Sequence, residues 1–224
     1  MIDGLPNWIN WAFIATFFVT IALFHLANGR SKKLSLFIVV WSLFHAVLAY
    51  NGFYNKTDLF PPRFLLVLIP SLSFLIFGLL KKNREQILAK RNIRASTFLH
   101  VIRIPVEIML FYLYLYKTMP QLMTFEGRNF DIIAGILALV SGILFYVKSV
   151  GKTFLLVFNG IGLLLILFVF VNGILSSELP IQMFAFDQPT KALEYFPFVL
   201  LPATIVPIVI YTHIIDLILL MRKV

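Results

Sequence analysis

The side chains in this sequence best suited to chemistry are ionisable groups inside apolar segments. His100, Arg103 and Glu107 fall in the apolar stretch 97–116. Their spacings of three and four residues place them on one face of a helix. Ionisable groups are costly inside a membrane, so such a face points into a helix bundle and marks a candidate site for a ligand, an ion or a proton.

A second pair, His213 and Asp216, shares one face of the last apolar stretch. At 1.5 Å per residue, His45 and Glu107 both lie roughly 15 Å from one end of their own stretches, the end next to a connection rich in Lys and Arg. We therefore expect the second, fourth and seventh stretches to converge on one polar intramembrane cavity. The predicted ligand-binding or proton-binding residues are His45, His100, Arg103, Glu107, His213 and Asp216.

The structural alternative is that these groups only hold helices together. Arg103 would then pair with Asp216 or Glu107, since membrane bundles use buried polar pairs in this way. Pro105 lies between Arg103 and Glu107 and removes a helix hydrogen bond. It supports both interpretations, because kinks serve packing as well as function.

A second polar cluster is expected at the opposite end of the bundle. Glu126, Arg128 and Asp131 precede the fifth apolar stretch, and Asp187 lies in the last long connection. We expect Arg128 to pair with Asp187 or Glu126 and so to form a lid, with Asp131 near the start of a helix.

The elements that must position these residues are apolar runs near the roughly 20 residues a helix needs to cross a bilayer. The predicted fold is an all-α bundle of seven transmembrane helices forming a single domain over residues 1–224. The composition agrees, with 60% hydrophobic and 13% charged residues. The predicted spans are about 8–28, 34–53, 64–80, 97–116, 131–148, 153–174 and 196–220.

Charge sets the predicted orientation. Most of the 19 Lys and Arg residues fall in alternate connections and at the C-terminus, which predicts a cytoplasmic C-terminus and an outside N-terminus. The net charge of +9 is explained by anionic lipid headgroups at the cytoplasmic face, and not by nucleic acid. The predicted location is the plasma membrane, or the inner membrane of a bacterium.

Three functions remain open, and an enzyme is neither predicted nor excluded. The first is binding or transport of a small molecule, ion or proton. The second is metal-dependent hydrolysis inside the membrane, with His45, His213 and Asp216 as candidate zinc ligands. The third is a receptor-like or cofactor-binding bundle in which two histidines hold haem.

Two known seven-helix families bear on these functions. Ser42 and His45, with His213 and Asp216, resemble the site of the alkaline ceramidase and adiponectin-receptor hydrolases. In that family the seventh helix carries two histidines four apart, whereas here a histidine and a carboxylate lie three apart. Microbial rhodopsins carry retinal on a lysine of the last helix, and 196–220 contains no lysine, which excludes that chemistry. The absence of cysteine excludes disulfides and thiolate metal sites.

Overall fold

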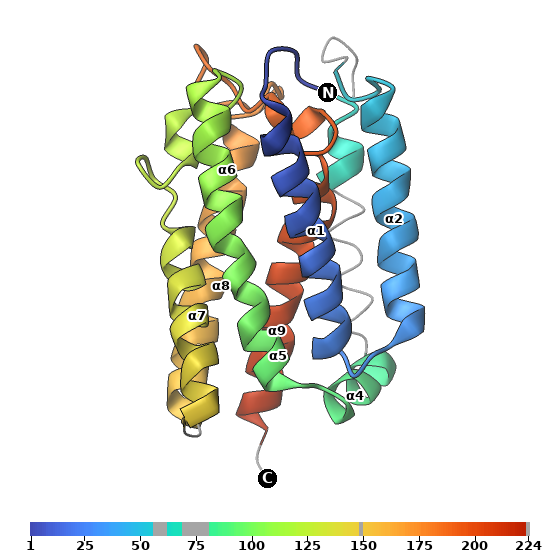
Figure 1. The fold of residues 1–224 in the computed structure, drawn as a ribbon, viewed down its shortest axis with the longest axis vertical. Helices are drawn as coiled ribbons and strands as arrows, with labels where there is room; N and C mark the ends of the chain where they lie inside the picture. The colour runs from blue at the N-terminus through green and yellow to red at the C-terminus, as the bar shows by residue number, and fades with distance from the viewer. Residues whose placement is uncertain (56–61, 69–80, 148–149, 223–224) are drawn as a thin grey trace.

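The computed structural model describes residues 1–55, 62–68, 81–147 and 150–222 as a bundle of roughly parallel and antiparallel helices (Figure 1). The N-terminus lies at one end of the bundle and the C-terminus at the other (Figure 1). We call these the N-terminal end and the C-terminal end. The described part of the chain contains helices and no strands.

Five helices are long and apolar enough to cross a membrane. Their outward faces carry large exposed apolar side chains, such as Trp11, Phe18 and Leu164, as expected for contact with lipid. The five are α1 (Asn7–Ala27), α2 (Lys32–Tyr50), the continuous α5–η1–α6 (Ile93–Leu115), α8 (Lys152–Leu175) and η4–α9 (Leu201–Met221). The membrane class predicted from the sequence is thus supported.

Two of the seven predicted spans are not among these five helices. The fifth corresponds to α7 (Asp131–Val147), an apolar helix shorter than the other five. The third, 64–80, lies largely outside the described residues, which include only its first part, up to Leu68.

The fourth span begins earlier than its apolar run suggests. The Asn92 side chain accepts a hydrogen bond from the Ala95 amide at 3.2 Å and caps α5 (Ile93–Leu99), to which η1 (His100–Ile102) and α6 (Arg103–Leu115) are joined. Counted from Ile93, Arg103 lies roughly 15 Å along the span and so at its middle. By the same count Glu107 lies roughly 21 Å along the span, in the half nearer the N-terminal end of the bundle.

The short helix α7 starts well below the end of α6 that reaches the N-terminal end of the bundle (Figure 1). After α6 the chain passes through η2 (Gln121–Met123) and folds back on itself. Two backbone bonds close this turn: the Arg128 amide donates to the Leu122 carbonyl at 3.1 Å, and the Asn129 amide donates to Thr124 at 3.2 Å. The fold-back carries Asn129 and Asp131 down to the depth of α6's polar residues.

The contacts between helices show how the bundle is packed. The α8 helix packs along α9, and α5 and α6 pack between α1 and α7. The α2 helix lies at the edge of the bundle and contacts α1 and η4 (Leu201–Ile205) (Figure 1). At the C-terminal end, α4 (Lys81–Ala89) packs on α9 (Val206–Met221), where Leu88 is buried.

The last connection closes the N-terminal end of the bundle. Ser176 and Thr190 join its two sides through their hydroxyl groups at 2.7 Å. The Ala192 amide, in η3 (Ala192–Glu194), donates to the Thr118 carbonyl at 2.9 Å. Gln188 reaches the Met119 carbonyl at 2.6 Å. This connection is therefore fixed to the one that follows α6.

Candidate functional site

Arg103 is the centre of a buried polar network between α6, α7, α8 and α9. Its Nε and Nη2 atoms donate to the two carboxylate oxygens of Asp131 at 2.6 and 2.5 Å. Nη2 also donates to the Gly162 carbonyl at 3.0 Å, and Nη1 lies 3.2 Å from Nε2 of His213. Arg103 therefore pairs with Asp131, not with Asp216 or Glu107 as the structural alternative proposed.

The contacts of His213 define its tautomer. An arginine can only donate, so Nε2 of His213 accepts from Arg103 and the ring proton is on Nδ1. Nδ1 donates to Oδ1 of Asn159 at 2.9 Å, and the Asn159 amide nitrogen donates to the Leu155 carbonyl at 2.8 Å. His213 is consequently a neutral imidazole held by two oriented neighbours.

His100 stacks on His213 with ring centroids 3.8 Å apart and planes 9° from parallel. Neither ring nitrogen of His100 has a hydrogen-bond partner among the described residues, although the side chain is fully buried. Gly162 on α8 permits this arrangement. A Cβ atom there would lie 2.4 Å from Cε1 of His213 and 3.3 Å from Nη1 of Arg103.

Glu107 is joined to this network through Asn129. The side-chain nitrogen Nδ2 of Asn129 donates to Oε1 of Glu107 at 2.7 Å and to the Met123 carbonyl at 3.1 Å. The side-chain oxygen Oδ1 of Asn129 accepts from the backbone amide of Asp131 at 3.0 Å. The Asn129 side chain is thus fully engaged and fixed in orientation. Oε2 of Glu107 has no partner among the described residues, although Glu107 is only 1% exposed.

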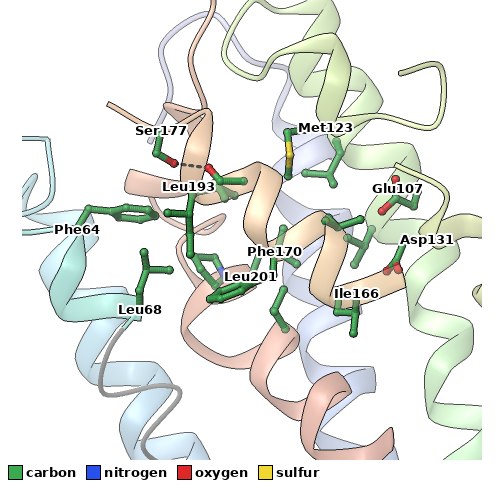
Figure 2. A pocket seen from close by; sticks show the side chains of 17 residues that line it. Phe64, Leu68, Glu107, Met123, Asp131, Ile166, Phe170, Ser177, Leu193 and Leu201 are labelled. Atoms are coloured by element: carbon green, nitrogen blue, oxygen red, sulfur yellow. Dashed lines mark hydrogen bonds between the residues drawn. The ribbon is translucent and has the colours of Figure 1, made fainter. Parts of the chain in front are cut away.

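Glu107 and Asp131 line one end of a pocket of about 560 Å³, part of which is open to the outside (Figure 2). Phe64 and Leu68 form the opposite end (Figure 2). The walls come mainly from α6, α8 and η4–α9 and are apolar, including Val106, Leu110, Ile166, Val169, Phe170, Leu201 and Val206.

Pro202 contributes to the wall where the last span is distorted. Leu201–Ile205 is a π-helical turn, and proline at its second position lacks the amide proton of a regular helix. Such turns often occur at functional sites. Here the distortion presents Leu201 and Pro202 to the pocket.

His45 lies away from the Arg103 network. Its Nδ1 is 2.6 Å from the Tyr54 hydroxyl, and its ring packs edge-on against Trp41 at 4.4 Å. The α2 helix does meet the last span, through Ser42 and Thr204 at 2.8 Å. The expected convergence of helices 2, 4 and 7 on a polar cavity is therefore corrected: the pocket is largely apolar, and no α2 residue lines it.

Asp216 belongs to a separate cluster at the C-terminal end. Nε of Arg91 donates to Asp216 at 2.7 Å, and the Ser96 hydroxyl donates to the other carboxylate oxygen. Arg91 also reaches Asn28 at 2.8 Å, so the cluster ties α1, α5 and α9 together. The sequence places Arg91 among headgroup-facing charges, whereas in the structure its side chain is fully buried.

The predicted lid at the N-terminal end is corrected as well. Glu126, Arg128 and Asp187 are exposed, and within the described residues no ion pair joins them. The Arg128 guanidinium lies 5.9 Å from the centre of the Phe184 ring. Asp131, the fourth member of the predicted cluster, is instead the buried partner of Arg103.

The candidate zinc ligands occupy three different environments. His45 contacts Tyr54, His213 contacts Asn159, and Asp216 contacts Arg91. In the described ranges, no three His, Asp or Glu side chains are grouped so as to hold a metal ion. His100 and His213 stack on each other, which is unlike two axial ligands on opposite faces of a haem.

A stripe of buried residues along α8 is the sequence feature that indicates which face of this helix lines the site. Asn159, Gly162, Ile166, Val169 and Gly173 repeat at spacings of three and four residues, and all are buried. That periodicity marks the inward face of a helix that is apolar on all sides. The stripe supplies the carbonyl that Arg103 binds and one wall of the pocket.

Comparison with known proteins identifies the family. A family described as a domain of unknown function (DUF8737) matches residues 59–221, and the chain belongs to it. No curated protein and no solved structure matches the chain. All of the residues that line the pocket lie within the matched range, whereas His45 lies outside it.

Proposed function

We propose that this member of the DUF8737 family is a seven-span membrane protein that binds a small, largely apolar molecule in the pocket beside Glu107. The observation that carries the proposal is the buried Oε2 atom of Glu107. The Glu107 side chain lines an apolar pocket, and this atom has no partner among the described residues. Buried polar atoms are nearly always hydrogen-bonded, so such an atom favours a ligand or a water as its partner.

The connectivity supports the seven-span topology. The α2 helix ends at the N-terminal end of the bundle, and α4 lies at the C-terminal end (Figure 1). Tyr50 and Lys81 thus lie at opposite ends of the bundle, which supports the predicted third span, 64–80, as one further crossing. With α7 as the fifth crossing, the total is seven.

The charges of the two ends support the proposed orientation. Basic residues cluster in the connections at the C-terminal end, which favours a cytoplasmic position beside anionic headgroups. Examples of these basic residues are Arg30, Lys32, Lys33, Lys90, Arg94 and Lys152. The plasma or bacterial inner membrane is the proposed location. Tags before Met1 and after Val224 should be accessible from opposite sides of sealed vesicles, and accessibility from one side would contradict seven spans.

A pair of substitutions on α8 tests ligand binding. Val169 lines the pocket, whereas Val171, two residues on, is 50% exposed on the outer face. The probe is a dodecyl chain with a photoreactive diazirine, applied to the purified full chain in phosphatidylcholine nanodiscs, with labelled residues located by mass spectrometry.

We expect labelling of pocket residues in the wild-type protein. Val169→Phe should reduce it roughly tenfold, equivalent to about 1.4 kcal/mol, because the added ring fills the pocket. Val171→Phe should leave it unchanged. Labelling confined to lipid-facing residues, or equal labelling of the two variants, would contradict a ligand-binding pocket.

A further inference from the structure

We infer that the ligand is a hydrophobic amine, bound as an ammonium ion whose N–H donates to Oε2 of Glu107 and whose apolar part extends toward Phe64 and Leu68. This inference rests on the proposed ligand-binding function and names its chemical class. It comes from the hydrogen bonds and charges at the acidic end of the pocket.

The two acids that line the pocket differ in their remaining capacity. Both oxygens of Asp131 accept from Arg103, and this ion pair is neutral as a whole. Glu107 receives one hydrogen bond, from Asn129 on Oε1. Among the described carboxylate oxygens at this end of the pocket, Oε2 of Glu107 is therefore the one that has no hydrogen-bond donor.

No described cation neutralises Glu107. Every ion pair in the described part of the chain joins other residues, and Arg103 directs its N–H groups to Asp131, Gly162 and His213. His213 is neutral because its Nε2 accepts from Arg103. A carboxyl group buried at this depth without a cation takes up a proton, whereas a bound ammonium ion keeps it ionised by providing both the charge and the N–H donor.

The shape of the pocket selects an amphiphile over a small cation. Apart from Glu107, Asp131 and Ser177, the pocket is lined by apolar and glycine residues. The hydroxyl of Ser177 is already used by the Gly173 carbonyl at 2.7 Å. Figure 2 shows the two carboxylates at one end and Phe64 and Leu68 at the other, with Phe170 and Leu201 between them. A cationic head with an apolar tail matches this polarity.

Three ligands of equal chain length separate the charge from the tail. Dodecylamine, 1-dodecanol and dodecanoate are tested as competitors of the diazirine probe on the purified full chain in phosphatidylcholine nanodiscs, with empty nanodiscs subtracted. We expect dodecylamine to compete about tenfold better than the alcohol, since hydrogen bonds to charged groups are roughly twice as strong as neutral ones. Dodecanoate should be the weakest.

Glu107→Gln keeps the size of the side chain and removes its charge. It should abolish the preference for the amine and leave competition by the alcohol within about twofold of the wild-type value, because the apolar contacts remain. The matched control is Glu126→Gln, an exposed position at the same end of the bundle. It should keep the full preference.

Each outcome bears on a different claim. Equal competition by the amine and the alcohol in the wild-type protein, or an amine preference that persists in Glu107→Gln, would overturn the amine assignment and leave the ligand pocket standing. Failure of all three compounds to compete in the wild-type protein, together with no labelling of pocket residues, would overturn both. The selectivity of the wild-type protein decides the question even if Glu107→Gln does not fold.

Discussion

Arg103 on α6 and Asp131 at the start of α7 form a two-bond ion pair in the interior of the bundle, with donor–acceptor distances of 2.6 and 2.5 Å. Both side chains are at most 5% exposed. A pair buried to this extent constrains structure strongly, because removing one member leaves the other charge without a partner. The pair also holds Asp131 in place next to Asn129. The Asn129 side chain in turn donates to Glu107.

The first prediction concerns this ion pair. Asp131→Leu and Arg103→Leu should each lower the free energy of unfolding by roughly 3–5 kcal/mol, because each strands a buried charge. The double variant Arg103→Leu/Asp131→Leu should lose much less than the sum of the two. Unfolding in a detergent–denaturant titration measures all three. Additive losses would show that the two side chains are not coupled.

Sequence reasoning identified Arg103 but not its partner, and the reason is physical. The sequence predicts depth from the ends of apolar runs, and Asp131 begins such a run, which places it at the end of the bundle. The fold-back after α6 carries it inward, and that turn depends on backbone bonds to Leu122 and Thr124 that have no hydropathy signature. Arg91 illustrates the same limit, since a basic residue near a helix end looks the same whether it faces headgroups or Asp216.

The helices themselves were more predictable, because hydropathy records contact with lipid directly. The bounds of α1 and α8 agree with the predicted spans within one residue. The pocket was not predictable in this way. It depends on which faces of α6, α8 and α9 meet, and this packing leaves only a weak trace, such as the repeat from Asn159 to Gly173.

The second prediction tests the close approach of α8 to the histidine pair. Gly162→Ala should lower the free energy of unfolding by roughly 1–3 kcal/mol, because the new methyl group would overlap the His213 ring. Gly160→Ala, two residues away on the same helix, is the matched control. A Cβ atom there meets nothing within 4 Å, so stability should be unchanged or should rise by up to about 1 kcal/mol. Equal effects would contradict the His213–Gly162 contact.

The third prediction concerns the cluster at the C-terminal end. Arg91→Leu should destabilise the protein by roughly 3–5 kcal/mol, because it leaves Asp216 buried without its cation. Arg94→Leu, at an exposed position three residues on, should change stability by less than about 1 kcal/mol. The same titration measures both. An Arg91→Leu protein as stable as the Arg94→Leu protein would place Arg91 at the surface.

The last prediction concerns the pH dependence of stability and uses Glu194, which lies outside the membrane-spanning helices. Burial raises the pKa of Glu194 from its ordinary value of 4.5 to about 8, with a further increase from the nearby Glu178 carboxylate and an opposing effect from Lys191. Below pH 4.5 the carboxyl is protonated in the folded and the unfolded protein alike. As the pH rises from 4.5 to 8, the unfolded chain loses this proton while the folded protein keeps it.

The stability contributed by Glu194 is therefore complete at acidic pH and is lost as the pH rises through this window, with no further change above it. We expect the unfolding temperature of the wild-type protein to fall between about pH 5 and 9 as this proton is lost. Glu194→Gln should remove most of that fall and stabilise the protein at the alkaline end, because the amide stays neutral. Glu126→Gln, at an exposed position, should keep the wild-type slope. A slope unchanged in Glu194→Gln would show that another group controls the pH response of the connection that closes the bundle.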